Sequence, residues 1–255
     1  MPHDPGTVKL VGAGPGAADL LTLRAARAIE SAQALLYDAL VCDEVVALAP
    51  AACLKIQTGK RAGRTSMKQE TINRLMLRLA RRGLRVVRLK GGDPSVFGRV
   101  GEEQAFLNAH GISTEVVPGV TAASAAAAQF GFPLTYRGQA RRLVFATATT
   151  RDGALAETGW AADREATLAL YMGRDQLSAL AARLIAEGRS PHTPVMAVEN
   201  AGRADARAMP GRLGALGQAL AAAGCEGPVV VVVGEAAAQA PAFLNAEPAL
   251  IEARS

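Results

Sequence analysis

The sequence predicts an α/β protein built from two domains. Short apolar segments rich in β-branched residues alternate with segments of helical periodicity, beginning with Val8–Val11 and the amphipathic Asp19–Ser31. This alternation is typical of a parallel sheet with helices on both faces. Five expected strands precede residue 118, which is enough for a complete sheet. We therefore expect a boundary within residues 118–133, with a parallel sheet in residues 1–120 and a mixed sheet in residues 121–255.

Each element of the first half has a local signal. A helix is expected from Ser66, because Gln69 three residues later completes a capping box, to Gly83, which can end it. The remaining helices are expected at residues 19–31, 43–49 and 100–109. The strands are expected at the short apolar segments 8–11, 34–37, 54–57, 85–89 and 114–117.

The second half also alternates expected strands and helices, but it does not repeat the sequence of the first half. Helices are expected at residues 121–129, 175–187 and 212–223. Strands are expected at residues 143–147, 167–171, 194–199, 207–209 and 228–233, and the last is a continuous apolar run that suits an interior strand. The polar segment 148–164 is the longest expected loop, and long loops inside compact domains are often functional.

The composition disfavours several classes of function. No apolar run reaches the length of a membrane span, and the N-terminus lacks the basic and apolar regions of a signal peptide. The net charge is +5, but aromatic residues make up only 4% of the chain and no dense basic run contains them. Nucleic acid is therefore not expected as a partner. A small anionic substrate, bound by arginine side chains, fits the charge better.

Cysteine and histidine are scarce and show no metal-ligand spacing, so no metal site is expected. They are Cys42, Cys53, Cys225, His3, His110 and His192. The cysteines are interpreted as reduced thiols of a cytoplasmic protein.

The most informative segment is Arg88–Glu103, which begins in an expected buried strand. Gly91 and Gly92 can adopt positive φ and let another molecule approach the backbone. Pro94 holds Asp93 extended, on a turn at the C-terminal end of a parallel strand, where open α/β sheets bind ligands. A plain turn with solvated charges is the alternative. The density of glycine, proline and charged residues favours a binding site.

A second segment matches a dinucleotide-binding fingerprint. Gly12-x-Gly14-x-x-Ala17 follows an expected strand, and Asp38 ends the next strand about twenty residues later. Alone, the pattern favours an NAD-dependent oxidoreductase. However, Pro15 lies where a pyrophosphate-binding helix would start, and proline has no N–H to donate. The fingerprint also leaves Lys90–Glu103 unexplained.

Segments distributed in order along residues 8–236 carry a resemblance to a known family. They are Val11–Gly16, Leu20–Thr22, Tyr37-Asp38, Gly59–Gly63 with Ser66 and Gln69, Arg88–Glu103, Val117–Ala122, Pro133–Thr135 with Arg137-Gly138, Tyr171–Gly173 and Val198–Ala201. Together they resemble the tetrapyrrole (precorrin-type) methyltransferases, in the branch that methylates uroporphyrinogen III. The Gly-Gly-Asp-Pro segment, taken with Gly-Lys-Arg-Ala-Gly, is the most specific part of the match.

The resemblance implies a fold, a cofactor and a reaction. The expected fold has two α/β/α domains with a cofactor cleft between them and is not a true Rossmann fold. The expected cofactor is S-adenosyl-L-methionine, with S-adenosyl-L-homocysteine as product, and the expected assembly is a homodimer. The expected reaction adds two methyl groups to uroporphyrinogen III and gives precorrin-2, which feeds sirohaem, cobalamin or haem d1 synthesis. Because the chain lacks the dehydrogenase–chelatase region fused to some relatives, we expect methylation only.

The resemblance also assigns residues to roles. The cofactor is expected to lie against Pro15, Gly91, Gly92, Asp93, Val96, Thr121, Ala122, Met172 and Ala201, and less strongly against the backbone near Val229. The catalytic residues are expected to be Asp38 and Lys60 as an acid–base pair, with Arg99 and Glu102 lining the active site. Arg137 is expected to bind the substrate. For Met172, Pro15, Lys60 and Glu102 the alternatives are a core methionine, a turn proline, a solvated loop lysine and a helix N-terminal acid.

Four departures from the usual family pattern lie around the expected tetrapyrrole pocket. Phe usually stands at Ser95, Gly at Val100 and His at Tyr136, and Thr147-Ala-Thr149 replaces Thr-Gly-His. The departures leave two alternatives to the main hypothesis, a methyltransferase for a different precorrin and a non-catalytic tetrapyrrole-binding relative. The fingerprint leaves a third, the oxidoreductase built on Gly12–Asp38.

Overall fold

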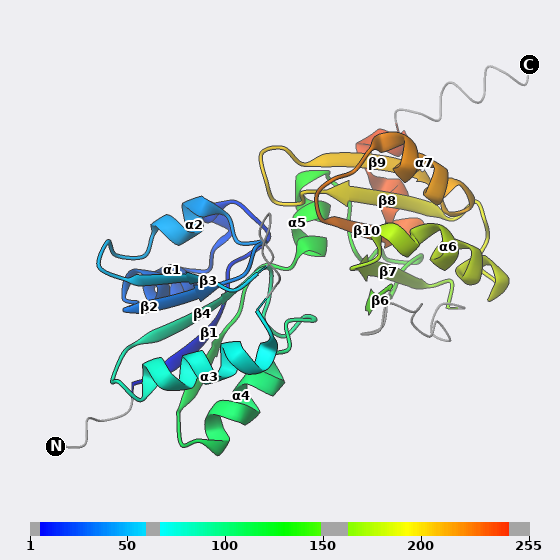
Figure 1. Ribbon diagram of the computed structural model, residues 1–255. Coiled ribbons are helices and arrows are strands. Elements are labelled where there is room, and N and C mark those ends of the chain that lie inside the picture. Colours follow the sequence, from blue (N-terminus) through cyan, green and yellow to red (C-terminus); the bar gives the residue numbers. More distant parts are fainter. Residues whose placement is uncertain (1–5, 60–66, 149–162, 245–255) are drawn as a thin grey trace, which may run out of the picture. The chain divides into compact units, whose positions relative to one another are not determined.

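The computed structural model describes residues 6–59, 67–148 and 163–244 (Figure 1). The chain divides into two compact units, Met1–Thr121 and Ala122–Ser255. Each unit contains one five-stranded sheet with helices packed on it. The predicted α/β class is therefore confirmed. None of the described helices has the length and apolar character that a membrane span requires.

The first unit contains a parallel sheet in the order β3-β2-β4-β1-β5. Each neighbouring pair of strands runs parallel, so the C-terminal ends of all five strands share one edge. The strands are β1 (Val8–Gly12), β2 (Ala34–Tyr37), β3 (Leu54–Gln57), β4 (Val86–Lys90) and β5 (Thr114–Val117). The central position of β4 means that its side chains are covered on both faces.

The described α-helices that cover this sheet are α1 (Leu23–Glu30), α2 (Asp43–Ala47), α3 (Gln69–Ala80) and α4 (Val100–Ala109). Val87 and Leu89 of β4 belong to the apolar cluster with α1 and α2, whereas Val86 belongs to the cluster with α3 and α4. Because side chains alternate along a strand, Arg88 and Lys90 share the face of Val86. The sequence Val-Val-Arg-Leu-Lys thus places two cations beneath α3 and α4.

Several predicted helices begin earlier than the helices of the structure, and two of them lie in the first unit. The expected helix over residues 19–31 is a 3₁₀ turn at Ala18–Leu20 followed by α1, whose start is capped by Thr22 Oγ1 accepting from Ala25 N at 3.1 Å. The helix expected from Ser66 is α3, which begins at Gln69 after Lys68, so Gln69 is its first residue and not the third that the expected capping box requires. Ser66 lies outside the described residues.

The second unit contains a sheet in the order β6-β7-β10-β8-β9. β6 and β7 run parallel, whereas β10 is antiparallel to β7 and to β8, and β9 is antiparallel to β8. β6, β7 and β8 therefore end at the same edge. The strands are β6 (Arg142–Thr147), β7 (Ala166–Tyr171), β8 (Pro194–Glu199), β9 (Arg207–Arg212) and β10 (Val229–Val233). β9 is longer than the segment 207–209 expected from the sequence.

Helices cover both faces of the second sheet. The helices α6 (Leu177–Ala186) and α7 (Leu216–Ala223) share an apolar cluster with Leu168 and Val231. The other face packs against α5 (Ala122–Gln129) and the 3₁₀ helix η4 (Glu235–Gln239), and α8 (Pro241–Leu244) follows η4. Two further 3₁₀ turns precede helices: η2 (Arg174–Gln176) before α6 and η3 (Leu213–Ala215) before α7.

Candidate active site

The strand-end edge of the first sheet collects most of the residues predicted for this unit. Asp38 directly follows β2, Gly91–Asp93 follow β4, and Thr121 follows β5 by four residues. Pro15 lies in the turn after β1. Because parallel strands end together, topology alone brings these segments to one edge, which is where open α/β sheets bind ligands.

Glycine is required where the turns after β1, β4 and β5 meet. Gly14 and Gly92 exchange two backbone hydrogen bonds, with N···O distances of 3.2 and 2.7 Å. A Cβ on Gly119 would lie 2.3 Å from the carbonyl oxygen of Gly92, and one on Gly12 would lie 2.7 Å from Gly119. Gly92 has φ 69°, and an added Cβ there would lie 3.9 Å from the nearest heavy atom. The positive φ therefore favours glycine at this position, where a Cβ would be in ordinary van der Waals contact with Thr121.

Asp93 ties two of these turns together. Its Oδ1 accepts a hydrogen bond from Ser95 N at 2.7 Å, and its Oδ2 accepts one from Gly119 N at 2.9 Å. The sequence predicted a carboxylate that contacts a ligand. The structure adds a positioning function for the same group, and each oxygen keeps a second lone pair that could accept a hydrogen bond.

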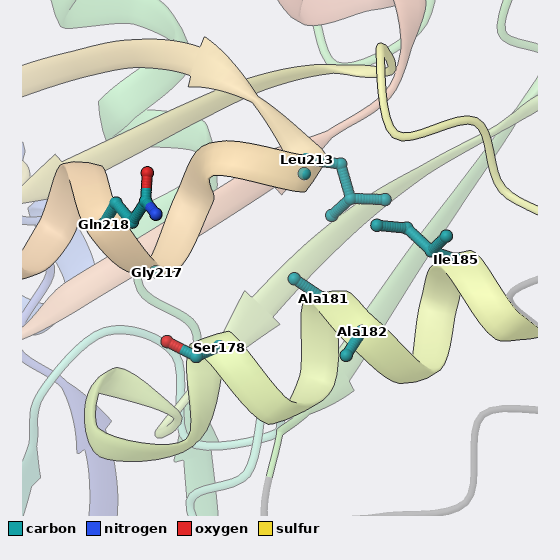
Figure 2. Close-up of a pocket in the computed structure, with 8 residues that line it drawn as sticks. Ser178, Ala181, Ala182, Ile185, Leu213, Gly217 and Gln218 are labelled. Atoms are coloured by element: carbon teal, nitrogen blue, oxygen red, sulfur yellow. The ribbon is translucent and has the colours of Figure 1, made fainter.

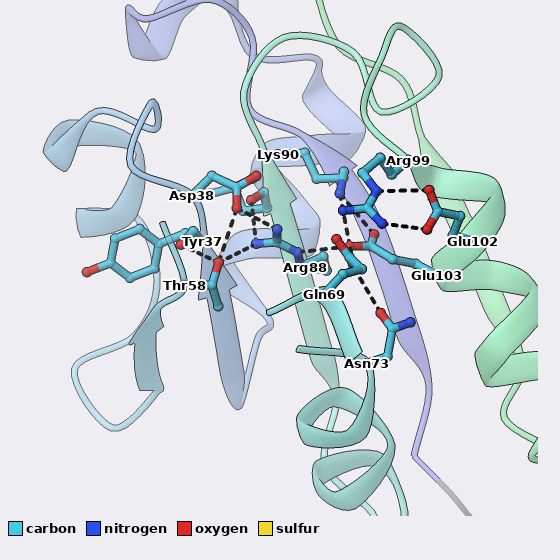
Figure 3. A network of polar contacts seen from close by, with 11 residues as sticks. Tyr37, Asp38, Thr58, Gln69, Asn73, Arg88, Lys90, Arg99, Glu102 and Glu103 are labelled. Atoms are coloured by element: carbon cyan, nitrogen blue, oxygen red, sulfur yellow. Dashed lines mark hydrogen bonds and ion pairs between the residues drawn. The ribbon is translucent and has the colours of Figure 1, made fainter. Parts of the chain in front are cut away.

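Asp38 is held by an ion pair from the sheet interior (Figure 3). Its Oδ1 accepts from Arg88 Nη2 at 2.5 Å and from Thr58 Oγ1 at 3.1 Å. Arg88 Nη1 also donates to Thr58 Oγ1 at 3.0 Å. The Asp38 side chain is 32% exposed, whereas that of Arg88 is 3% exposed. A buried cation thus fixes a carboxylate that remains open to reactants.

Behind Arg88 lies a fully buried carboxylate, Glu103 of α4. Its Oε1 accepts from Arg88 Nε at 3.3 Å, and both of its oxygens lie 3.0 Å from Lys90 Nζ. Gln69 Nε2 donates to Oε1 at 2.9 Å and to Asn73 Oδ1 at 2.9 Å. Burial lowers the pKa of Lys90, and the neighbouring Glu103 opposes that shift. Asp38, Arg88, Lys90 and Glu103 together balance two positive and two negative charges.

The roles of Arg88, Lys90 and Glu103 were missed by sequence reasoning. A signal existed, because Arg88 lies inside the segment 85–89 that was predicted to be a buried strand, and Lys90 follows two residues later on the same face. A buried strand with charges on one face requires an ionic partner on the helix that covers it.

Arg99 and Glu102 pair with each other at the start of α4. Arg99 Nε and Nη2 donate to the two oxygens of Glu102 at 2.8 and 2.6 Å, and this hydrogen bonding raises the pKa of Arg99. Both side chains are exposed, at 45% and 57%. Arg99 also has φ 57°, an unusual conformation for a residue other than glycine. Strained residues of this kind gather at functional sites.

In the second unit, two predicted cofactor residues lie at the shared end of β7 and β8. Met172 follows β7 with φ 54° and is 58% exposed, while the buried Ala201 follows β8. Asn200, between β8 and Ala201, also has φ 54°. Ala122 joins this group, because the N–H of Ala123 donates to Tyr171 Oη at 3.2 Å.

The remaining predicted site residues are Arg137, Val96 and Lys60. Arg137 is exposed in the turn closed by the Tyr136–Ala140 bridge, and it has no ion pair with a described residue. Val96 is half-buried in the segment before α4. Lys60, the proposed partner of Asp38, lies outside the described residues, and so does Thr149.

The geometry disagrees with the dinucleotide fingerprint. A pyrophosphate site needs a helix whose free N–H groups follow the glycine turn directly. Here a 3₁₀ turn intervenes, and α1 begins only at Leu23, where the side chain of Thr22 already caps it. Asp38, which would bind the ribose, is bound by Arg88 instead.

A separate pocket of about 230 Å³ lies in the second unit between α6 and the segment Leu213–Gln218 (Figure 2). Small and apolar side chains such as Ala181 and Ile185 line it, and none of the predicted site residues does. Within the described parts of the chain, no group of histidine, cysteine and carboxylate side chains could hold a metal ion.

Comparison with solved structures identifies the fold as that of the tetrapyrrole methyltransferases. Uroporphyrin-III C-methyl transferase from Thermus thermophilus, solved in complex with S-adenyl homocysteine, is 40% identical to this chain with a TM-score of 0.78. The alignment covers 91% of this chain and 93% of that one. A family model of tetrapyrrole (corrin/porphyrin) methylases matches residues 7–217. The chain belongs to this family, and the predicted resemblance is confirmed.

Curated relatives agree with this assignment. Siroheme synthase of Methylococcus capsulatus is 44% identical over 232 residues, which are 90% of this chain and 49% of that protein. The chloroplastic S-adenosyl-L-methionine-dependent uroporphyrinogen III methyltransferase of Arabidopsis thaliana is 43% identical over 242 residues, covering 93% of this chain and 65% of that protein. The chain thus spans about half the length of the first relative and about two thirds of the second.

Proposed function

We propose that this protein is an S-adenosyl-L-methionine-dependent C-methyltransferase that converts uroporphyrinogen III to precorrin-2 by two methyl transfers. The observation that carries the proposal is the strand-end site, in which the Gly91-Gly92-Asp93 turn lies beside the buried support of Asp38. Relatives named for this reaction match at least 90% of the chain at 40% identity or more.

The described residues fit the cofactor. In the first unit, the Gly91-Gly92 turn leads to Asp93, whose carboxylate oxygens each keep a lone pair, next to Pro15 and Val96. Thr121, the last residue of the first unit, is a further candidate, and in the second unit the candidates are Ala122, Met172 and Ala201. Asn200 Oδ1, beside Ala201, is buried and accepts no hydrogen bond from a described residue.

The expected substrate is rich in carboxylates, and arginine side chains suit it. Exposed Arg137 has a guanidinium available for a bidentate contact with a carboxylate. Arg99 is already aligned by Glu102, so it presents a fixed cation at the N-terminus of α4. We assign Arg137 to substrate binding, and Arg99 and Glu102 to the wall of the active site.

Two tasks remain for the chain in the chemical step. The bound cofactor would supply an electrophilic methyl group, whose bonding electrons stay on sulfur as the new carbon–carbon bond forms. The protein must align the pyrrole carbon with that methyl and remove the proton that the pyrrole ring loses. Asp38 is our candidate base, because its Oδ2 accepts no hydrogen bond from a described residue and its side chain reaches solvent. Lys60 is proposed as its partner.

Three further proposals rest on the resemblance. We propose a homodimer and a cytoplasmic location, and we keep a different precorrin as the alternative substrate because of Ser95, Val100, Tyr136 and Thr149. Phe at position 95 and Gly at position 100 would change the segment that leads into α4, where Ser95 N already bonds Asp93.

Calorimetric titration separates the proposed class from the oxidoreductase. We expect the protein to bind S-adenosylhomocysteine with micromolar or tighter affinity and to show no heat with NAD. Binding of NAD without binding of S-adenosylhomocysteine would refute the proposal. Turnover of uroporphyrinogen III would then exclude the non-catalytic relative.

A further inference from the structure

The two oxygens of Asp38 have different surroundings. Oδ1 accepts from Arg88 Nη2 at 2.5 Å and from Thr58 Oγ1 at 3.1 Å. Oδ2 accepts no hydrogen bond from a described residue, and the side chain is 32% exposed. The carboxylate is therefore fixed through one oxygen while the other remains open.

Arg88 is itself immobilised at the opposite end. Its Nε contacts Glu103 Oε1 at 3.3 Å, and Glu103 is fully buried under two further donors, Lys90 and Gln69. The backbone of Arg88 lies in β4, between β1 and β2. Both ends of the guanidinium are thus bound, and a small displacement of Asp38 would cost a short charged hydrogen bond.

Stability alone does not account for this arrangement. Burying an ion pair is costly, and apolar side chains of similar volume commonly serve a core equally well. Lys90 could neutralise Glu103 without Arg88, because it contacts both carboxylate oxygens. Arg88 is the member of the cluster that reaches the one partly exposed carboxylate.

We propose that Arg88 is a positioning residue for the methyl transfer, which holds Asp38 through Oδ1 and directs Oδ2 toward the reactant. Glu103 fixes Arg88, and Thr58 is the second support of Asp38. This inference rests on the proposed function, in which Asp38 removes the pyrrole proton.

A double-mutant cycle tests the inference. We would measure kcat for uroporphyrinogen III and the Kd of S-adenosylhomocysteine in the wild type, Arg88→Gln, Asp38→Asn and the double variant. Arg88→Gln should lower kcat by about tenfold or more while leaving the Kd within about twofold, because general base catalysis is worth about 10²-fold or more. In the Asp38→Asn background the same change should cost less than about twofold, because the base it positions is already absent.

The control is Arg74→Gln, which removes an exposed arginine from its pair with Glu70 on α3 and should leave kcat unchanged. If Arg88→Gln does not fold, Thr58→Val removes the other contact to Asp38 and should give a smaller kcat loss that is again absent in Asp38→Asn.

The outcomes separate this inference from the proposed function. With an active wild type, two results would overturn the positioning role of Arg88. One is a double variant in which the two losses in kcat add, and the other is a Kd for S-adenosylhomocysteine that rises in parallel with the fall in kcat. A wild type that binds S-adenosylhomocysteine but does not turn over uroporphyrinogen III would overturn the proposed function. In that case the free energies of urea unfolding would still test the ion pair itself. A coupling between Arg88→Gln and Asp38→Asn would support the ion pair, and additive effects of the two substitutions would overturn it.

Discussion

Arg88 Nη2 lies 2.5 Å from Asp38 Oδ1, so an arginine that is 3% exposed holds a carboxylate that is 32% exposed. This contact joins the interior of the first unit to its strand-end edge. It also changes the interpretation of Asp38. A dinucleotide-binding protein would use this carboxylate to bind the ribose, whereas here the carboxylate pairs with Arg88.

Glu103→Gln should destabilise the protein by about 3–5 kcal/mol, because it leaves buried Lys90 without its compensating carboxylate. Urea unfolding measures the change. The control is Glu115→Gln, which removes a partly exposed pair with Lys9 and should cost about 0–1 kcal/mol. Equal effects of the two variants would show that the buried network contributes nothing beyond a surface pair.

Asp93→Ala should weaken binding of S-adenosylhomocysteine by about tenfold or more, since it removes two backbone ties as well as the lone pairs offered to the cofactor. Calorimetry measures the affinity. Glu30→Ala, at the exposed end of α1, is the control and should bind as the wild type does. An unchanged affinity in Asp93→Ala would contradict our placement of the cofactor.

Arg137→Ala should raise the KM for uroporphyrinogen III by about tenfold, because a charged hydrogen bond to a carboxylate is worth about 1.5–3 kcal/mol. The affinity for S-adenosylhomocysteine should not change. Steady-state kinetics and calorimetry on the same preparation test both parts. Loss of cofactor binding instead would show that Arg137 belongs to the cofactor site and not to the substrate site.

Glu199 should make stability depend on pH. The N–H of Gly227 is the main cause that lowers its pKa below the ordinary 4.5, and Arg207 and the N–H of Glu226 add to it. A carboxyl with a lowered folded-state pKa stabilises the protein above its unfolded pKa, and the contribution is lost as the pH falls through the folded value. Glu199→Gln should therefore be less stable than the wild type at pH 7, and the difference should shrink toward pH 3.

Unfolding at both pH values measures that difference. Glu70→Gln, in an exposed pair with Arg74, is the control and should change stability by no more than about 0.5 kcal/mol at either pH. A gap between the wild type and Glu199→Gln that stays constant from pH 7 to pH 3 would contradict the prediction.

The sequence predicted elements whose signals are local. The run Val229–Val233 and the segment Thr114–Val117 are strands as expected, and α4 covers residues 100–109 as expected. The start of α1 was missed because helical periodicity continues through the 3₁₀ turn at Ala18–Leu20, whereas Thr22 fixes the cap.

The site could be predicted only in part, for a related reason. Asp38 and the Gly91–Asp93 turn are visible in the chain because they follow apolar strands. The contact between Arg88 and Asp38 spans 50 positions and depends on β4 lying beside β2, which a strand pattern does not specify. The roles of single residues, such as Arg137 and Met172, came from the family resemblance and remain predictions.

The most direct test of the account is anaerobic turnover of uroporphyrinogen III with S-adenosylmethionine, with the product followed by absorbance and mass. We predict a gain of two methyl groups and a parallel release of S-adenosylhomocysteine, with Ser95, Val100 and Tyr136 as tolerated variations. A protein that binds S-adenosylhomocysteine but leaves the mass of uroporphyrinogen III unchanged would contradict the proposed substrate.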